Sequence, residues 1–191
     1  MKTIASIVVA ILLASTSLFG QTGRSLYYYW GAGVSRESFS SEVRADGEGN
    51  VVMEQRFGSN VSAEVLGFYW PLDNHHTIVG IVSNGAFDGD EVAKASFDLT
   101  TFTTSGSVMH FVTDTVGVGF MLRGDVGLAG HRVTGSNGEE TKTDVGLGMV
   151  LGVGYGFRAD VGNVVVGANV TLRRIGSQNF NGYGLSVGLL W

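Results

Sequence analysis

The sequence predicts an all-β protein: an eight-stranded antiparallel up-and-down transmembrane β-barrel that is preceded by a cleaved signal peptide. Large apolar residues alternate with small or polar ones along most of the chain, as in the terminal segment YGLSVGLLW. Mean hydropathy is +0.22, although 30 of the 191 residues are glycine. Successive side chains of a strand point to opposite faces, and a barrel in lipid carries its apolar face outward. The pattern therefore indicates strands with one lipid face and one small, polar lumen face.

The first twenty residues have the layout of a secretory signal peptide. Lys2 supplies a positive charge, residues 4–13 are apolar, and small or polar residues follow up to Gly20. This layout is typical of exported proteins. A single spanning helix is the competing interpretation, but the apolar run is shorter than the roughly 20 residues that such a helix requires. We expect a signal peptide over residues 1–20, cleaved between Ala14 and Gln21, and a barrel domain over residues 26–191.

Composition excludes several other classes of protein and site. The chain has no cysteine, which removes disulfides, thiolate metal sites and a thiol nucleophile. The formal net charge of -5 provides no basic patch for nucleic acid. An exported chain of this kind must be stabilised by its sheet.

The first four expected strands lie between residues 28 and 112. Their outward residues are expected to be Tyr28, Trp30, Ala32 and Val34 in the first, Val61, Ala63, Val65 and Tyr69 in the second, and Val79 and Ile81 in the third. In the second strand, Glu64, Leu66 and Phe68 are expected to face the lumen. The fourth strand, residues 97–112, is rich in threonine and has the least definite register.

The last four expected strands alternate more regularly. Their outward residues are Val116, Val118, Phe120, Leu122, Val126 and Leu128 in the fifth; Val145, Leu147, Met149, Leu151, Val153, Tyr155 and Phe157 in the sixth; Val164, Val166, Ala168, Val170 and Leu172 in the seventh; and Tyr183, Leu185, Val187, Leu189 and Trp191 in the eighth. Glycine or a polar residue fills most of the positions between them. Eight is an even number, as bacterial outer-membrane barrels require.

The connections between these strands alternate between two kinds. Residues 71–74, 113–115 and 160–163 form short segments rich in turn-forming residues. Residues 36–56, 85–94, 135–143 and 176–181 form longer loops that are charged or rich in glycine. Short turns on one rim and long loops on the other are typical of a barrel with periplasmic turns and extracellular loops.

Aromatic residues gather at the ends of the expected strands. The short-turn rim is expected to carry an aromatic girdle of Trp30, Tyr69, Trp70, Tyr155 and Phe157, with Phe111 beside it. A second set, which includes Phe39 and Phe180, lies near the long loops. Amphipathic rings favour the two membrane interfaces, so this distribution supports a membrane barrel over a soluble sandwich.

The terminal strand and the layout of the whole mature chain resemble the small outer-membrane β-barrel domain family, which includes the OmpA transmembrane domain and OmpX. The specific part is the assembly signal Tyr183, Leu185, Val187, Leu189 and Trp191. The family usually ends on phenylalanine, so a terminal tryptophan is a departure. The resemblance implies a monomer in the bacterial outer membrane, surrounded by lipid and lipopolysaccharide, whose last strand is read by the barrel-assembly machinery.

Several inward positions carry charge. Eight strands leave an interior just wide enough for side chains to fill it. Charges of both signs share this space, and they are tolerable only when paired. We predict a cross-lumen network centred on Glu64 and Arg123, and therefore a plugged barrel, with these members: Glu64, Arg123, Asp125, Arg158 and Arg173.

Motifs that suggest catalysis have structural explanations. Residues 184–188 match G-x-S-x-G, but a nucleophile elbow needs a helix after its serine, and the chain ends three residues later. We expect no catalytic, cofactor-binding or metal-binding residue. His131 with Ser136 and Glu139 or Glu140 is the one cluster that could serve a lipid A-modifying enzyme.

These observations predict a non-enzymatic barrel that acts in envelope structure or in surface interaction through its extracellular loops. Loop 36–56, which carries charges of both signs, is the expected site for a surface ligand. Three alternatives remain open: a lipid A-modifying enzyme, a small channel, and a soluble lipocalin-like barrel with an apolar interior.

Overall fold

The computed structural model describes residues 26–39, 43–45, 51–53, 57–72, 76–92, 95–113, 115–135, 140–142, 145–160, 162–176 and 178–191. The expected signal peptide, residues 1–20, lies outside the described residues, as do parts of the long loops. Some strand residues, Glu64 among them, are described only in their backbone.

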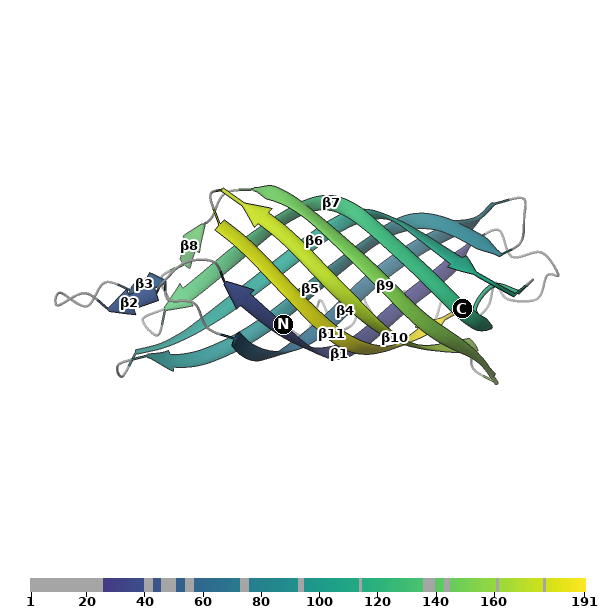
Figure 1. Cartoon of the computed structure of the whole chain (residues 1–191), viewed down its shortest axis with the longest axis horizontal. Coiled ribbons are helices and arrows are strands. Elements are labelled where there is room, and N and C mark those ends of the chain that lie inside the picture. Colours follow the sequence, from purple (N-terminus) through teal and green to yellow (C-terminus); the bar gives the residue numbers. More distant parts are fainter. Residues whose placement is uncertain are drawn as a thin grey trace, which may run out of the picture.

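Eight strands form the closed barrel that the sequence predicts (Figure 1). They are β1 (Tyr27–Phe39), β4 (Phe57–Pro71), β5 (Thr77–Val92), β6 (Ala95–Phe111), β7 (Gly119–Gly135), β9 (Gly146–Ala159), β10 (Gly162–Ile175) and β11 (Gln178–Leu190). Each pairs antiparallel with the next barrel strand in the chain, and β1 pairs with β11 to close the ring. Within the described part of the chain, no helix has the length and hydropathy needed to cross a membrane.

The long-loop end of the barrel contains more strand than the sequence indicated. β2 (Val43–Ala45) pairs with β3 (Val51–Met53) inside the expected loop 36–56, and β8 (Glu140–Lys142) pairs with β7. The β5–β6 ladder continues to the pair Val92 and Ala95, through the expected loop 85–94. An antiparallel ladder satisfies its own backbone hydrogen bonds in lipid and in water alike, so a polar composition does not end it.

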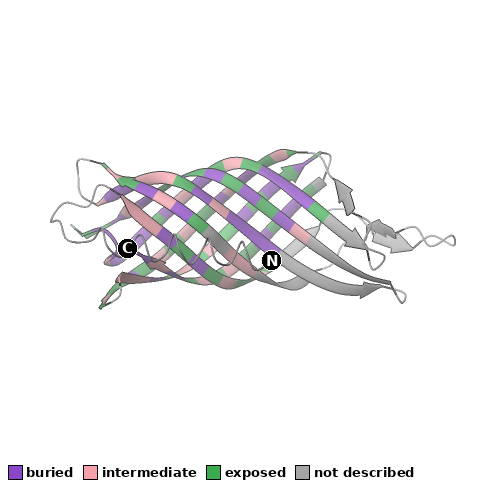
Figure 2. Cartoon of the chain, turned by 180° about the vertical axis from the view of Figure 1, so that it is seen from behind, coloured by how far each residue is buried: buried purple, intermediate pink, exposed green. Residues whose placement is uncertain are grey.

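The two faces of the sheet follow the predicted alternation in most strands, as the alternating burial in Figure 2 shows. On β7, Val126 and Leu128 are exposed, whereas Arg123 and Asp125 are buried. On β10, Val166 is exposed and its neighbour Val165 is buried. The exposed apolar residues form the outward face, so the predicted orientation of these strands is confirmed.

β4 is an exception, because its alternation changes phase within the strand. Leu66 is 40% exposed and Trp70 47% exposed, whereas Tyr69 is fully buried. The prediction placed Leu66 in the lumen and Tyr69 outside, and it was wrong for both. The register against β5 shifts between Glu64 and Leu66, which marks a β-bulge. A bulge adds one residue and moves every later side chain to the opposite face.

The β6–β7 turn folds into the mouth of the barrel at the short-turn end. Val116 was expected to face outward on a strand, but it is buried in a turn, and β7 begins only at Gly119. Gly117 has φ +81°, a left-handed conformation that an extended strand does not allow and that favours glycine. The side-chain amide of Asn163 donates to the Val116 carbonyl at 3.2 Å, which ties this turn to the start of β10.

Candidate functional site: the lumen and the long-loop rim

An apolar cluster, here called the floor, lies in the lumen at the short-turn end. Tyr29 and Tyr69 meet edge to face, with 6.4 Å between their ring centroids. Phe111, which the sequence placed in the outer girdle, is fully buried and contributes to the floor. The complete floor consists of Tyr29, Tyr69, Ile78, Val82, Met109, Phe111, Val116, Met121, Val165 and Leu190. These residues come from seven of the eight barrel strands and from the β6–β7 turn.

A salt-bridge layer lies directly above this floor. Nε of Arg123 donates to both carboxylate oxygens of Asp125 at 3.0 Å, and Nη2 donates to Oδ2 at 2.6 Å. The two side chains are only 5% and 0% exposed. The Ser107 hydroxyl donates to Asp125 at 2.5 Å, and its oxygen lies 2.9 Å from the Tyr69 hydroxyl. Because the Ser107 proton points to the carboxylate, Tyr69 donates to Ser107.

The Tyr29 ring completes the environment of this ion pair. The guanidinium carbon of Arg123 lies 5.7 Å from the centroid of that ring, within the range of a cation–π interaction. The layer thus joins a buried cation and anion to a hydroxyl chain and an aromatic face. Removing one partner of such a pair costs about 3–5 kcal/mol, because the remaining charge stays buried.

A second charged layer lies nearer the long loops. Arg173 is buried, and its Nε donates to Thr103 Oγ1 at 2.8 Å while Nη2 donates to Asn84 Oδ1 at 3.3 Å. The space beside it amounts to about 30 Å³. A cavity needs roughly 10–15 Å³ to hold a water, so this space admits one or two waters. It does not amount to an aqueous channel.

The structure brings together some of the expected network and removes one member. Arg123, Asp125 and Arg173 lie in the lumen, but the ion pair joins residues two apart on one strand. Arg158 is exposed, because it is the last residue but one of β9 and projects beyond the packed floor. The side chain of Glu64 lies outside the described residues. Tyr69 and Ser107 were missed, since the β4 bulge and the uncertain β6 register hid their orientation.

Four of the five expected girdle residues lie on the outward face. Trp30, Trp70, Tyr155 and Phe157 are about half exposed, and the rings of Tyr155 and Phe157 lie 4.9 Å apart. Tyr69 is the exception, because it points into the lumen. The short-turn end therefore carries a partial ring of aromatic side chains at the depth that suits a membrane interface.

The expected assembly signal is the strand that closes the barrel. Tyr183, Leu185 and Val187 are exposed on its outward face, and Leu189 and Trp191 are partly exposed. Trp191 exchanges two backbone hydrogen bonds with Tyr28, of 3.1 and 3.0 Å, just beyond the β1–β11 ladder. The last residue of the chain is thus held against the first barrel strand.

The candidate catalytic residues lie apart or outside the described residues. His131 is buried and packs on Phe180, with 4.9 Å between the ring centroids. Ser136 and Glu139 lie outside the described residues, and only the backbone of Glu140 is described. Ser186 lies within β11, which continues as a strand to Leu190. Among the described residues, no three His, Asp or Glu side chains gather as metal ligands would.

Comparison with known proteins shows the fold. No protein-family model matches the sequence, and neither does any curated protein. The structure of Ail, the attachment invasion locus protein of Yersinia pestis, is similar with a TM-score of 0.53 and 12% identity over 88% of this chain and 100% of Ail. Neisserial surface protein A is similar with a TM-score of 0.52 and 15% identity over 85% of this chain and 95% of that protein. With its outward apolar face, the chain has the fold of the small barrels of the bacterial outer membrane that its sequence resembles.

Proposed function

We propose that this protein is a non-enzymatic outer-membrane barrel with a non-conducting lumen, and that it acts in surface interaction or envelope structure through its extracellular loops. The buried side chains of the lumen are the observation that supports the proposal. The apolar floor, the Arg123–Asp125 layer and the Arg173 layer follow one another along the barrel axis. An open diffusion path would need a continuous aqueous space, and buried side chains at three levels argue against one.

Glu64 is the carboxylate that we propose for the upper charged layer. In the β4–β5 ladder the backbone of Glu64 pairs with Asn84, and Asn84 pairs with Thr103 in the β5–β6 ladder. Both Asn84 and Thr103 accept hydrogen bonds from Arg173. The Glu64 position thus lies one strand spacing, about 5 Å, from Asn84 and two strand spacings from Thr103. The cross-lumen pairing predicted for Glu64 is therefore better directed to Arg173 than to Arg123.

The conductance of the refolded protein in a planar lipid bilayer tests the closed lumen. We expect no stable current steps. A large-pore porin in the same bilayers serves as the control that insertion and detection work. The shift in gel migration between unboiled and boiled samples shows that both proteins are folded, because closed barrels resist unfolding until heated. Large and stable single-channel steps from this protein would overturn the proposal.

Recognition is assigned to the loops because they stand on a rigid scaffold. β2 and β3 form a hairpin within residues 36–56, at the long-loop end (Figure 1). Ail, which shares the fold, has been solved with the heparin analogue sucrose octasulfate. Loop 36–56 of this chain has three arginines and five acidic residues, a net charge of -2. This charge does not favour a polyanion, so we propose a protein surface as its ligand.

Replacement of residues 41–55 by a short glycine-serine turn tests this role. We expect the variant to keep its heat-dependent gel shift and to lose adhesion of bacteria that display it to host cells or matrix proteins. Shortening residues 136–139 is the matched control. Unchanged adhesion by the first variant would remove recognition from this loop. Lipid A mass spectra from cells with and without the protein would show a difference if the enzymatic alternative held.

A further inference from the structure

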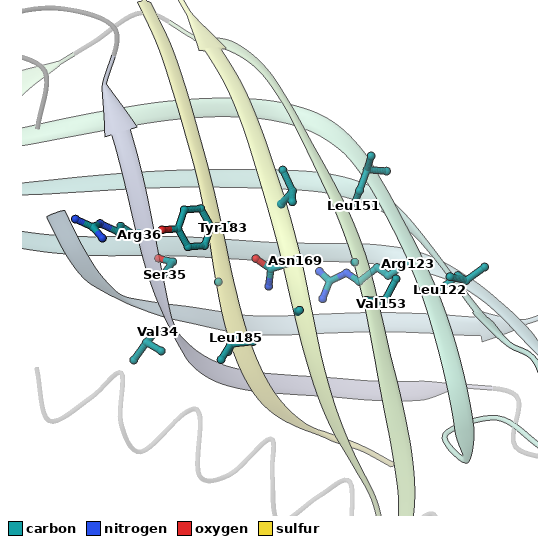
Figure 3. Close-up of a pocket in the computed structure, with 14 residues that line it drawn as sticks. Val34, Ser35, Arg36, Leu122, Arg123, Leu151, Val153, Asn169, Tyr183 and Leu185 are labelled. Carbon is teal, nitrogen blue, oxygen red and sulfur yellow. The ribbon is translucent and has the colours of Figure 1, made fainter. Parts of the chain in front are cut away.

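A groove on the outer wall crosses five neighbouring strands, β1, β11, β10, β9 and β7 (Figure 3). It has a volume of about 920 Å³, and outward apolar side chains line most of it. Its lining also includes the inward-facing row of the same register: Ser35, Gly184, Asn169, Gly152 and Arg123. Val34, Leu185, Ala168, Val153 and Leu122 are consecutive partners in the strand register and form its lower border. The small Ala168 lies between Leu185 and Val153, so the border is lowest there.

Gly184 and Gly152 lie in the next row of the register, which forms part of the groove wall. A Cβ on either glycine would point toward the inward side chain of Asn169, so their backbone forms the base of the groove. On the far side of that row, Tyr183 and Arg36 are paired neighbours on β11 and β1. The groove is thus apolar along most of its length and carries a guanidinium and a phenol at one end (Figure 3).

The groove runs obliquely along the barrel, from the long-loop end toward its middle. Counted from the short-turn end, Arg36 is the tenth residue of β1, whereas Leu122 is the fourth residue of β7. Six residues correspond to roughly 20 Å along a strand, or roughly 15 Å along the axis of a barrel whose strands tilt by about 40°. This is about half of the hydrocarbon thickness of a bilayer. The groove therefore spans the depth of one leaflet.

We propose that this groove binds one membrane lipid of the loop-side leaflet, with an acyl chain along Leu185, Ala168 and Val153 and its phosphate on Arg36. Arginine is suited to phosphate because its planar fork can donate two parallel hydrogen bonds. The Tyr183 ring beside it supplies the amphipathic surface that favours the interface. A two-fold dimer about the membrane normal would place the two Arg36 side chains at one depth. The two positive charges would then approach each other, so a second copy of this chain is disfavoured as the occupant of the groove.

The test is native mass spectrometry of the purified full-length protein in detergent, with lipids of identical acyl chains added one at a time. We expect more bound phosphatidylglycerol than phosphatidylcholine. One basic residue near an anionic surface contributes about a fivefold change in affinity, so Arg36→Gln should lose about that factor for phosphatidylglycerol. The loss for phosphatidylcholine should be smaller, because the choline ammonium already offsets the charge of its phosphate. Arg174→Gln is the matched control, because Arg174 is exposed on the same rim but does not line the groove.

A substitution that fills the groove distinguishes binding of the acyl chain from a general attraction between charges. Ala168→Phe should reduce the binding of both lipids at least threefold, whereas Val166→Phe, on the same face of β10 and outside the groove, should leave it unchanged. Equal losses in the two arginine variants, or equal behaviour of the two phenylalanine variants, would overturn the proposal. A lipid-free dimer that Ala168→Phe abolishes would assign the groove to a second copy. Lipid binding that appears only once the apolar residues 4–13 are removed would assign it to that segment.

Discussion

Asp125→Asn is the sharpest test of the buried ion pair. The substitution keeps the size of the side chain and can still accept from Ser107, but it removes the charge that Arg123 contacts through three hydrogen bonds. Arg123 then stays 95% buried beside a neutral amide, since its side chain is only 5% exposed. Loss of one partner from a buried pair costs about 3–5 kcal/mol, which lowers the folding equilibrium constant by about two to three and a half powers of ten.

Urea unfolding in lipid vesicles, followed by tryptophan fluorescence and by the gel shift, measures this loss. Asp160→Asn is the matched control, because Asp160 is exposed in the turn after β9 and should leave the midpoint unchanged. The double variant Arg123→Met with Asp125→Leu should recover most of the stability, since it removes both buried charges. A loss below about 1 kcal/mol for Asp125→Asn, with the control unchanged, would refute the assignment of this pair as a closed, desolvated layer.

Three further predictions concern the floor, the turn and the last residue. Tyr69→Phe removes the hydroxyl that lies 2.9 Å from Ser107 Oγ and should lower the unfolding free energy by about 1 kcal/mol in the same urea assay. Gly117→Ala should destabilise by about 1–2 kcal/mol because φ is +81°, whereas Gly124→Ala, where an added Cβ meets open space, should not. Replacement of Trp191 by Ser should lower the amount of heat-modifiable barrel in the outer membrane, and Trp191→Phe should preserve it.

The outward face of β7, β9, β10 and β11 could be predicted because lumen positions there hold mostly glycine and polar residues. Hydropathy then changes at most steps, which is enough to identify the period of two despite apolar runs such as residues 164–166. On β6, threonine and serine occupy both faces, so their hydropathy does not separate lumen from lipid. Thr103 and Ser107 are buried, while Thr104 lies on the exposed face. The orientation of β6 is set by its register with β5 and β7, which no local pattern contains.

The charged residues show a second limit of sequence reasoning. Periodicity assigned Arg123, Asp125 and Arg173 to the lumen, and the structure places all three there. The periodicity could not identify the partners of these residues. Contacts across a barrel depend on the stagger between strands as well as on which face of the sheet a side chain occupies. Arg158 shares the inward phase of its strand, yet it is exposed because it lies at the strand end. The spacing of residues along a strand predicts which face of the sheet a side chain occupies. Its depth in the lumen depends on how the strands are staggered in the assembled barrel.

The three layers of buried side chains lie away from the loops that we propose for recognition. The floor uses the strand ends near the short turns, and Arg123 with Asp125 lies only a few residues above it. Arg173, the uppermost, is still two residues below the end of β10. All three layers thus lie within the strands, so a change confined to loop 36–56 is expected to leave the Arg123–Asp125 pair in place. The residues that stabilise the barrel and the loop that we propose for recognition therefore occupy different parts of the chain.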